Sequence, residues 1–552
     1  MALNLEGAHA WPEDLANYYR EKKWWLGLTW GDILDRNADM YGSRTAIIDD
    51  ETSLTWEQFR DKVDRLAWAL LELGVKKNDT IVVQVKNNHE YLVSLMAICR
   101  IGAVELQALT NHGEREISHF INMTDAVAWI VSLDDKKKDL RSLVSEVKPK
   151  FNSLRNVICI GDNIPDGCED FNKMIAEANP PKNRDFWTSI RPDPNHVYLI
   201  GLTGGTTGLS KGVPRTYNDH ILDGYYWGKS QQLTSEDVGL VLTPAGHNLA
   251  HVCVMFPMLL EAGTIVIANI PNPDRTMEII QNTKSTFLWC VPTQLSRMLD
   301  SPNFDKYDLS SLRFVGSGGA HVPAELIRGL NKRVGCDFVN GFGMIEGPCT
   351  CTRLWDTFEA KCNTIGTATC PYVEFKIIDP VTEVELPRGK EGEMVAKGPH
   401  VFQGYYKTSR EGIYTKDGFF RSGDLAKMDE EGRISITGRI KDVINRGGEM
   451  ISAREIEEIM MTHARVAEAA VIAMPCPDMG ERVCLYVRTK EGAADLTLEE
   501  VQKHCEEAGL AKFQWPERVE NLSELPLTNV GKPDKKKMRE MISNILKEEG
   551  VI

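Results

Sequence analysis

Hydrophobic positions in the first 160 residues follow two alternating periods. Residues 80–85 form a β-branched run typical of a buried strand, whereas 90–104 repeats its apolar residues with the helical period as far as Gly102. Two further apolar runs, 128–133 and 156–161, also predict strands. Strands that alternate with helices in this way predict parallel sheets covered by helices.

The pattern changes twice in the last third of the chain. Between 390 and 436, short strands are separated by glycine-rich turns, which predicts a small antiparallel or barrel-like unit. After Arg439, an amphipathic helix at 453–463 precedes two strand patterns and a second helix at 496–507. We therefore place a domain boundary near residues 439–441.

The predicted fold class is α/β with two domains. The large N-terminal domain, 1–439, is expected to contain stacked sheets with helices and a β-barrel-like subdomain at about 350–439. The smaller C-terminal domain, 440–552, is expected to be α+β. Both expectations follow from the change in hydrophobic period along the chain.

Composition narrows the function classes. The 552 residues carry 64 Lys and Arg against 79 Asp and Glu, so the net charge is −15, which argues against a general nucleic-acid binder. The longest apolar stretch, 252–260, is shorter than the roughly 20 residues of a membrane-spanning helix. The N-terminus shows no secretory pattern, and the 13 cysteines show no zinc spacing, so we expect reduced thiols and a cytoplasmic protein.

The strongest local signal is a glycine-rich loop after an apolar strand at 197–202. Its glycines let backbone N–H groups approach phosphate oxygens, its hydroxyls add donors, and Lys211 adds a positive charge. A flexible surface loop is the alternative interpretation. The loop lacks both the Walker A and the dinucleotide patterns. The candidate phosphate-binding residues are Thr203, Gly204, Gly205, Thr206, Thr207, Gly208 and Lys211.

The loop resembles the T-S-G-T-T-G-x-P-K-G signature of the adenylate-forming superfamily, with Gly204 at the usual serine and Ser210 where proline is frequent. Three further segments resemble motifs of that superfamily: NGFGMIEG at 340–347, FFRSGDLAKMDEEGRISITGRIKDVINRGGEMIS at 419–452 and ELPLTNVGKPDKKKMRE at 524–540. The four motifs occur in the superfamily's order and cover essentially the whole chain. Within the superfamily, the chain is most similar to the dihydroxybenzoate–AMP ligases and to aryl- or alicyclic-acid CoA ligases.

The resemblance implies a two-step reaction. A carboxylate attacks the α-phosphate of ATP to give an acyl adenylate and pyrophosphate, and a thiol then displaces AMP. It implies that Lys211 and its loop hold the β- and γ-phosphates and that Glu346 helps to hold Mg²⁺. Lys532 would bridge the carboxylate and the α-phosphate. A surface lysine and a solvated glutamate are the alternative interpretations of Lys532 and Glu346.

The resemblance also implies a nucleotide site. Phe342 would stack on adenine, with Gly318, Gly319 and Ala320 along the edge of the base. Asp424 would accept both ribose hydroxyls, and Arg439 would contact ribose or phosphate. The other residues expected in the nucleotide site are Asn340, Gly341, Gly343, Met344 and Ile436.

A second group of residues is implied for the thiol step. In the superfamily the C-terminal domain rotates between the two half-reactions, and Lys441 falls at the hinge position. In the rotated state a glycine-containing turn would face the site and the incoming thiol arm. The residues expected on this thiol side are Arg446, Gly447, Gly448 and Glu449.

The expected acid pocket combines features of two branches. His247 and Asn248 match the dihydroxybenzoate-activating branch, but Leu249 and Cys253 replace Tyr and Ser. Gly341 instead resembles the CoA synthetases. These changes remove polar groups, and unpaired buried polar groups are penalised. We therefore expect a small cyclic acid such as benzoate or cyclohexane carboxylate.

The sequence does not decide which thiol accepts the acyl group. The leading hypothesis is an AMP-forming acid–CoA ligase that uses ATP, Mg²⁺ and CoA. The alternative is a stand-alone aryl-acid adenylating enzyme that loads a phosphopantetheinyl carrier protein. A non-catalytic nucleotide-binding regulator is disfavoured because Lys532 and Glu346 are both present. A phosphotransferase is disfavoured because the loop has no Walker A pattern.

Overall fold

The computed structural model describes residues 4–135, 138–203, 210–270, 272–528 and 532–552. Its largest sheet has nine strands in the order β18-β17-β16-β15-β14-β12-β13-β1-β2, and the strands from β16 to β1 run parallel. The strands of this first sheet are β1 (Thr45–Ile48), β2 (Ser53–Thr55), β12 (Val238–Val241), β13 (Thr264–Ile267), β14 (Phe287–Cys290), β15 (Phe314–Gly318), β16 (Asp337–Gly343), β17 (Cys349–Cys351) and β18 (Thr367–Ala368).

The second sheet has seven strands in the order β11-β10-β4-β3-β5-β8-β9, which are parallel except for the β10–β11 hairpin. Its strands are β3 (Thr80–Gln84), β4 (Val104–Gln107), β5 (Ala128–Ser132), β8 (Asn156–Ile160), β9 (Glu169–Asp170), β10 (Val197–Leu202) and β11 (Gly212–Thr216). A two-stranded ribbon, β6 (Asp134–Asp135) and β7 (Lys138–Asp139), lies beside it.

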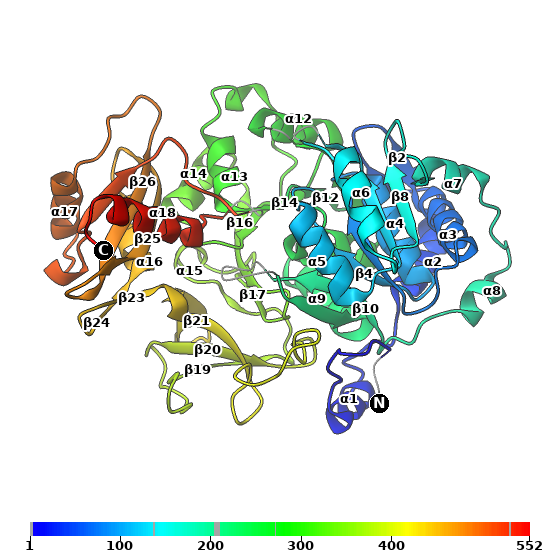
Figure 1. The fold of residues 1–552 in the computed structure, drawn as a ribbon, viewed down its shortest axis with the longest axis horizontal. Coiled ribbons are helices and arrows are strands. Elements are labelled where there is room, and N and C mark those ends of the chain that lie inside the picture. The colour runs from blue at the N-terminus through cyan, green and yellow to red at the C-terminus, as the bar shows by residue number, and fades with distance from the viewer. Residues whose placement is uncertain (1–3, 136–137, 204–209, 271, 529–531) are drawn as a thin grey trace.

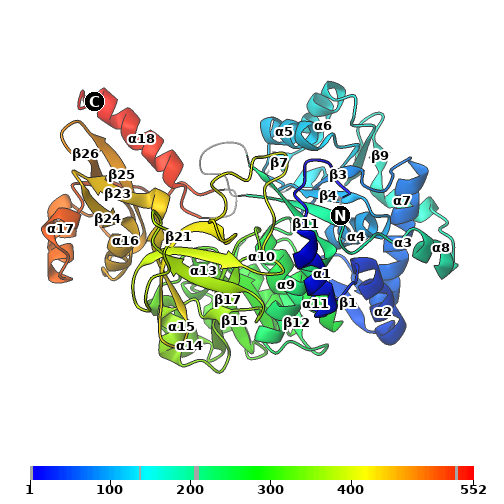
Figure 2. The same ribbon diagram turned by 90° about the horizontal axis from the view of Figure 1, so that it is seen from below.

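Helices cover both sheets and also fill the space between them (Figures 1 and 2). Residues of α2, α3, α4, α9 and α11 join the core between the sheets; α5 and α6 cover the outer face of the second sheet, and α12, α13 and α14 cover that of the first. The helices of this part are α1 (Glu13–Glu21), α2 (Trp30–Tyr41), α3 (Trp56–Glu72), α4 (His89–Arg100), α5 (Glu114–Thr124), α6 (Arg141–Val147), α7 (Phe171–Glu177), α8 (Arg184–Ser189), α9 (Tyr217–Ser230), α10 (Asn248–Ala250), α11 (Phe256–Glu261), α12 (Pro273–Thr283), α13 (Pro292–Leu299), α14 (Ala324–Arg333) and α15 (Phe358–Asn363).

Strand β3 shows why the sequence folds in this way. Ile81 and Val83 point into the core between the sheets, whereas Val82 joins the outer core with α5 and α6. Both faces are therefore apolar, as expected for a parallel strand buried on both sides. The strands and helix predicted between residues 80 and 161 are confirmed, with α4 at His89–Arg100.

Two smaller sheets follow in sequence. The third is antiparallel and contains β19 (Glu374–Ile378), β20 (Gly392–Lys397), β21 (Phe420–Met428) and β22 (Ile434–Arg439). The fourth contains β23 (Val443–Arg446), β24 (Glu449–Ser452), β25 (Val466–Cys476), β26 (Gly480–Thr489) and β27 (Arg518–Asn521), and packs with α16 (Ala453–Met461), α17 (Leu498–Glu507) and α18 (Lys535–Glu548). The fourth sheet lies at one end of the molecule (Figure 1). The predicted α/β class, with a large sheet domain and a smaller C-terminal unit, is confirmed.

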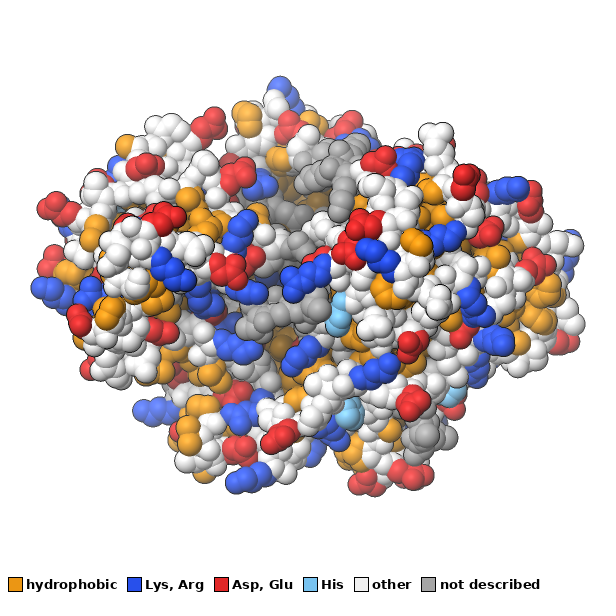
Figure 3. Space-filling model, viewed as in Figure 1, with side chains coloured by type: hydrophobic (Ala, Val, Ile, Leu, Met, Phe, Trp, Pro, Cys, Tyr) orange, Lys and Arg blue, Asp and Glu red, His pale blue; other side chains and the backbone are white. Residues whose placement is uncertain are grey.

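A cleft of about 2940 Å³ runs between the C-terminal unit and the large sheets. On the face seen in Figure 3, Lys and Arg side chains gather beside the hollow that separates the two parts. A protein with a net charge of −15 therefore still presents positive charge where an anionic ligand would enter.

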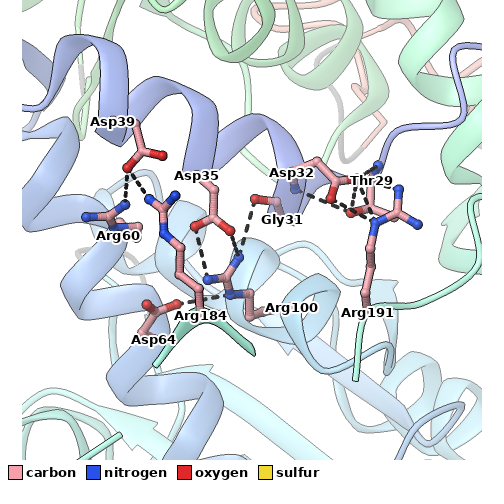
Figure 4. A network of polar contacts seen from close by, with 10 residues as sticks. All are labelled: Thr29, Gly31, Asp32, Asp35, Asp39, Arg60, Asp64, Arg100, Arg184 and Arg191. Carbon is pink, nitrogen blue, oxygen red and sulfur yellow. Dashed lines mark hydrogen bonds and ion pairs between the residues drawn. The ribbon is translucent and has the colours of Figure 1, made fainter. Parts of the chain in front are cut away.

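Hydrogen bonds and ion pairs connect the aspartates of α2 to arginines of neighbouring segments (Figure 4). Arg100 donates to both oxygens of Asp35, at 2.7 and 3.0 Å, and Arg191 donates to Asp32 at 2.6 Å. Arg184, on α8, bonds to Asp39. These contacts lie on the N-terminal side of the molecule, so we interpret them as structural.

Two further sequence expectations concern the cysteines and the membrane. All thirteen cysteines lie within the described residues and are unpaired. Among the described helices, none is both long and apolar enough to cross a membrane.

Candidate active site

The cleft is built at the carboxyl ends of parallel strands. Thr203 follows β10 in the second sheet, while Gly318 ends β15 and Glu346 follows β16 in the first. The loop after β12 adds His247. Ligands of open α/β sheets bind at this edge, so the sheets bring distant sequence motifs to one place.

The two ends of the glycine-rich loop are bonded to each other. The Thr203 N–H donates to the Lys211 carbonyl at 3.1 Å, and the Lys211 N–H donates to Thr203 Oγ1 at 3.1 Å. The Lys211 ammonium lies 4.8 Å from the ring centroid of Tyr405. The five remaining phosphate-loop candidates, Gly204, Gly205, Thr206, Thr207 and Gly208, lie outside the described residues.

Glu346 is held at the wall of the cleft by the same tyrosine. It is only 5% exposed, and the Tyr405 hydroxyl donates to its Oε1 at 2.9 Å. Burial raises the pKa of Glu346, while the bond from Tyr405 and the positive charge of Arg439 oppose that shift. A carboxylate near the predicted phosphate-binding loop is the type of ligand that Mg²⁺ uses, so the chemistry of Glu346 fits the predicted metal. Tyr405 connects Glu346 with Lys211.

A strip of small residues leaves room for a flat ligand. A Cβ on Gly318 would lie 2.5 Å from the Gly341 carbonyl oxygen, and Gly319 has a φ of +79°, so both positions require glycine. Phe342 packs its ring against the core of the third sheet and still lines the cleft. The other predicted nucleotide-site residues that line the cleft are Ala320, Asn340, Gly341, Gly343, Met344 and Ile436.

Asp424 presents one free oxygen. It is 2% exposed, and its Oδ1 accepts from Arg439 Nε at 2.8 Å, a pair set by the β21–β22 register. Asp424 Oδ2 is buried and has no hydrogen-bond partner among the described residues. A buried acceptor without a partner is costly, which suits a position that a ligand hydroxyl completes. Arg439 uses one of the roughly four lone-pair sites of this carboxylate, so the expectation that Asp424 accepts both ribose hydroxyls stays a prediction.

Lys532 reaches the cleft from the C-terminal unit. A Cβ on Gly319 would lie 3.3 Å from Lys532 Cε and 3.7 Å from Nζ, so the lysine side chain lies against the glycine strip. Burial lowers the pKa of Lys532 to about 8; the charge of Arg439 lowers it further and Asp424 opposes. A cation taken out of water next to a carboxylate is suited to stabilise an anionic ligand.

His247 and Asn248 begin the acid side of the cleft. His247 caps the short helix α10, since its Nδ1 accepts the Leu249 N–H at 3.2 Å. Burial lowers the pKa of His247 to about 3, and the positive charge of Lys532 adds to the shift. His247 is therefore neutral and close to Lys532. The five predicted acid-site residues all line the cleft: His247, Asn248, Leu249, Cys253 and Gly341.

Two tryptophans form a wall next to Gly341. A Cβ on Gly341 would lie 2.7 Å from Cη2 of Trp289 and 3.3 Å from that of Trp227. The two indoles meet edge to face at 5.0 Å, and both line the cleft. The absence of a side chain at Gly341 therefore leaves the space that the two indoles occupy, at the part of the cleft where the acid is expected. Trp289 is fixed by a 3.0 Å bond from its Nε1 to Gln231.

The expected thiol side lies elsewhere. The described residues that line the cleft include the hinge candidate Lys441 and exclude Arg446, Gly447, Gly448 and Glu449. These four residues span the turn of the β23–β24 hairpin, and Arg446 is bonded to Glu517 at 3.0 and 3.1 Å. The structure thus brings Lys532 to the cleft, whereas the turn expected on the thiol side is not part of the described cleft lining.

Three lining or supporting residues were missed by the sequence motifs: Trp227, Trp289 and Tyr405. The tryptophans sit in a helix and an apolar strand without a motif, and only the fold brings them to Gly341. Tyr405 belongs to a Gly-Tyr-Tyr run, which was visible in the sequence but carried no spacing relative to Glu346.

Two family descriptions match the chain. "AMP-binding enzyme" matches residues 34–406, and "AMP-binding enzyme C-terminal domain" matches residues 455–532. The chain therefore belongs to the AMP-binding enzyme family and is an adenylate-forming ligase, which confirms the resemblance drawn from its motifs.

Individual relatives extend over the full chain. The 2,3-dihydroxybenzoate-AMP ligase of Bacillus subtilis (strain 168) is 34% identical over 98% of this chain and 99% of its own. A salicylyl-CoA synthase / salicylate adenylyltransferase from Streptomyces sp is 31% identical over 98% of both chains. The crystal structure of ATP-bound MatB from Rhodopseudomonas palustris has 27% identity and a TM-score of 0.83, and covers 94% of this chain and 100% of that chain.

Proposed function

We propose that this ligase activates a small aromatic acid with ATP and passes the acyl group to a phosphopantetheine thiol. In the first step a carboxylate oxygen attacks the α-phosphorus and pyrophosphate leaves. In the second step the thiol sulfur attacks the acyl carbon, AMP leaves, and the thiol proton is released. The observation that carries the proposal is the position of Lys532 at Gly319, where a Cβ would lie 3.7 Å from Lys532 Nζ and 3.8 Å from Cδ1 of Leu249, a predicted acid-site residue.

The nucleotide would lie along the glycine strip. Asp424 Oδ2, buried and unpartnered among the described residues, is suited to accept a ribose hydroxyl; burial raises the pKa of Asp424, and Arg439 opposes that shift. Phe342 offers a flat face to the base. Glu346 would hold Mg²⁺, whose role when bound is to neutralise phosphate charge. The ATP-bound relative supports the choice of nucleotide.

Lys532 would act in the first step. Negative charge develops on the α-phosphate oxygens as the carboxylate attacks, and a buried cation stabilises it strongly because little water screens the interaction. Lys532 would also hold the carboxylate in line, which reduces the entropy cost of bringing two anions together.

The acid would be cyclic and flat. The wall of Trp227 and Trp289, with Leu249 and Cys253, forms an apolar slot beside Asn248. Aromatic walls favour ring stacking and edge contacts. The relatives named for dihydroxybenzoate and salicylate act on aromatic acids, in agreement with this slot.

The acceptor is better supported as a carrier-bound thiol than as free CoA. The leading sequence hypothesis was CoA, and three full-length relatives are named for CoA, but three others, the 34% identical relative among them, are named as aryl-acid AMP ligases, one of them also "salicyl-S-ArCP synthetase". Arg446, a candidate CoA contact, is already paired with Glu517. Free CoA is the second candidate, because one relative is named both salicylyl-CoA synthase and salicylate adenylyltransferase.

An ATP–pyrophosphate exchange screen tests the first step. Benzoate, its hydroxy and amino derivatives, cyclohexane carboxylate and open-chain acids of similar size are compared one at a time. We expect exchange with one or more aromatic acids and little with open-chain acids. Loading of an aryl carrier protein is then compared with CoA at equal thiol concentration. Exchange that depends on no acid, or that is fastest with open-chain acids, would contradict the proposal.

A further inference from the structure

A second cavity, of about 620 Å³, lies where the loop after β1 meets the start of α4. Six of its described lining residues are acidic and two are basic: Asp49, Asp50, Glu51, Glu90, Asp274 and Glu278 against Lys86 and Arg275. Arg275 is already bonded to Asp50 and to Glu278, at 2.7 Å in both cases. The excess of carboxylates therefore makes this cavity attractive to a cation.

Three side chains converge beside this cavity. Asp49 follows β1 of the first sheet, whereas His89 and Glu90 begin α4, which follows β3 of the second sheet. His89 Nδ1 lies 2.6 Å from Asp49 Oδ2 and 3.2 Å from Glu90 Oε2. One imidazole nitrogen and two carboxylate oxygens are thus within 4.8 Å of one another, close enough to surround a single metal ion.

Two buried oxygens at this place lack a partner. Glu90 is 7% exposed and Asn88 is 8% exposed, and both residues line the cavity. Within the described part of the chain, neither Glu90 Oε2 nor Asn88 Oδ1 has a hydrogen-bond partner. His89 Nδ1 carries at most one proton, and its shorter contact, to Asp49, uses that proton. A buried oxygen without a donor is costly, and a bound cation would supply the missing partner.

The backbone holds Asp49 in a fixed orientation. Its Oδ1 accepts the N–H groups of Glu51 and Thr52, at 2.9 and 2.7 Å. Its Oδ2 accepts the His89 N–H at 3.0 Å and also faces His89 Nδ1. A metal ion would therefore replace only the proton between Nδ1 and Oδ2, and the turn after β1 would keep its bonds.

The donor atoms indicate which class of metal would bind. An imidazole nitrogen with carboxylate oxygens suits zinc and related transition metals, whereas Mg²⁺ and Ca²⁺ prefer oxygen ligands. The ligand atoms of a tetrahedral zinc ion lie about 3.3 Å apart, because each lies about 2.0 Å from the metal. The 3.2 Å contact of His89 with Glu90 already has this spacing, and the shorter contact with Asp49 would widen as the ion replaces the proton.

We propose that Asp49, His89 and Glu90 bind one divalent transition-metal ion, with Zn²⁺ the best match and water in the remaining position. His89 binds through Nδ1 and keeps its proton on Nε2, and both acids bind as carboxylates. The described residues that line the cleft include none of the three, so the ion serves the fold and not the reaction. Its ligands come from segments after the first and the second sheet, so it links the two sheets and stabilises the folded protein.

Calorimetric titration of chelator-treated protein with Zn²⁺, Mg²⁺ or Ca²⁺, without acid or ATP, tests the site. We expect one equivalent of Zn²⁺ to bind at this cluster, at least about tenfold more tightly than Mg²⁺ or Ca²⁺. Glu90→Gln keeps the shape of the side chain and removes a charged ligand, so that equivalent should bind at least about tenfold more weakly. His89→Gln removes the nitrogen ligand and should have an effect of the same size.

Glu278→Gln is the matched control. Glu278 lines the same cavity, but it is paired with Arg275 at 2.7 Å and lies outside the cluster of three. This variant should bind Zn²⁺ as the wild type does. Zn²⁺ should also raise the midpoint of thermal unfolding of the wild type and of Glu278→Gln, and leave that of Glu90→Gln unchanged.

Cobalt(II) in the wild-type protein keeps the test decisive where a variant fails to fold. Nitrogen and oxygen ligands should give visible d–d bands without the strong near-ultraviolet band of thiolate ligands, which the thirteen unpaired cysteines could otherwise supply. Three results would overturn the proposal: no Zn²⁺ bound by the wild type, Zn²⁺ binding unchanged in both Glu90→Gln and His89→Gln, or a thiolate spectrum with Co²⁺. His89 would then be a histidine that pairs with two carboxylates without an ion. None of these measurements needs a substrate, so they judge the metal site even if the proposed function fails.

Discussion

The two sides of the cleft are held in place by different means. On the acid side, Trp289 is 1% exposed, wedged against Gly341 and bonded to Gln231 at 3.0 Å. On the other side, Lys532 sits on a C-terminal unit that meets the main body through polar contacts, among them His321 with Glu458 at 3.2 Å. Close packing fixes the acid wall, whereas the lysine depends on contacts that water can replace.

The contacts on the two sides of the cleft differ strongly in the free energy that they contribute. Removing a buried tryptophan side chain costs about 3–5 kcal/mol. Burial lowers the pKa of His321 to about 4, so its contact with Glu458 is not an ion pair at neutral pH, and a hydrogen bond contributes only about 0.5–1.5 kcal/mol. The acid wall is therefore expected to stay as it is through the reaction. The C-terminal unit can leave its position at small cost, in agreement with the rotation that the superfamily resemblance implies and with a thiol-side turn that is not part of the described cleft lining.

Among the variants that test this difference between the two sides of the cleft, Lys532→Ala is expected to have the largest effect. Loss of a cation aimed at the reacting phosphate should reduce ATP–pyrophosphate exchange about 100-fold or more. A supplied acyl adenylate should still react with the thiol at close to the wild-type rate, because the acid wall is untouched. Single-turnover assays of the two half-reactions measure this difference.

Lys547→Ala is the control for that experiment, since Lys547 lies in the last turn of α18, is exposed and is not among the described residues that line the cleft. It should leave both half-reactions unchanged. Equal loss of both half-reactions in Lys532→Ala would show that the lysine is not confined to adenylation.

Gly341→Val tests the closely packed acid side of the cleft. The new side chain would collide with Trp289 at 2.7 Å, and overpacking costs about 1–3 kcal/mol, so kcat/KM for the acid should fall roughly 5- to 150-fold. ATP affinity, measured by calorimetry, should change little. Gly329→Ala on α14, whose Cβ would only touch Leu299 at 3.5 Å, serves as the control for a generic glycine substitution. A loss of ATP affinity would assign Gly341 to the nucleotide strip instead.

The pH dependence of adenylation tests whether the first step needs the charged form of Lys532. Its pKa is lowered to about 8, so the charged form dominates below that pH and is lost above it. The kcat/KM for adenylation should therefore fall as the pH rises from 8, by up to about tenfold per unit. Lys532→Arg keeps its charge and should lack this fall between pH 8 and 10. The same fall in Lys532→Arg would assign the titration to another group.

The sequence predicted the periodic elements and the residues inside motifs. Strand β3 and helix α4 follow from local hydrophobic period, and Glu346, Asp424 and Lys532 follow from the resemblance, since each lies in a motif of fixed spacing. The structure brings these three residues to one cleft.

What the sequence could not predict is contact between distant segments. Tyr405 lies 59 positions from the Glu346 that it bonds, and nothing in the local pattern relates the two. The glycine at 341 was noted, but only the folded sheet shows that Trp227 and Trp289 fill its space.

The smallest expected effect concerns the thiol side. Arg446 lies in an ion pair with Glu517, 23% and 24% exposed, outside the described cleft lining, so Arg446→Ala should leave adenylation and thermal stability almost unchanged. If the β23–β24 turn meets the thiol arm after the C-terminal unit moves, the second half-reaction should slow by a few-fold, with a higher KM for the thiol substrate.

Arg482→Ala is the matched control, because Arg482 contacts the same Glu517 at 3.6 Å and lies outside that turn. Steady-state loading of carrier protein and of CoA measures both variants. A larger rise in KM for CoA than for the carrier would favour the free cofactor, since its nucleotide phosphates need the cation. Equal behaviour of the two variants would remove Arg446 from the thiol site and leave the acid wall and Lys532 as the functional halves of the cleft.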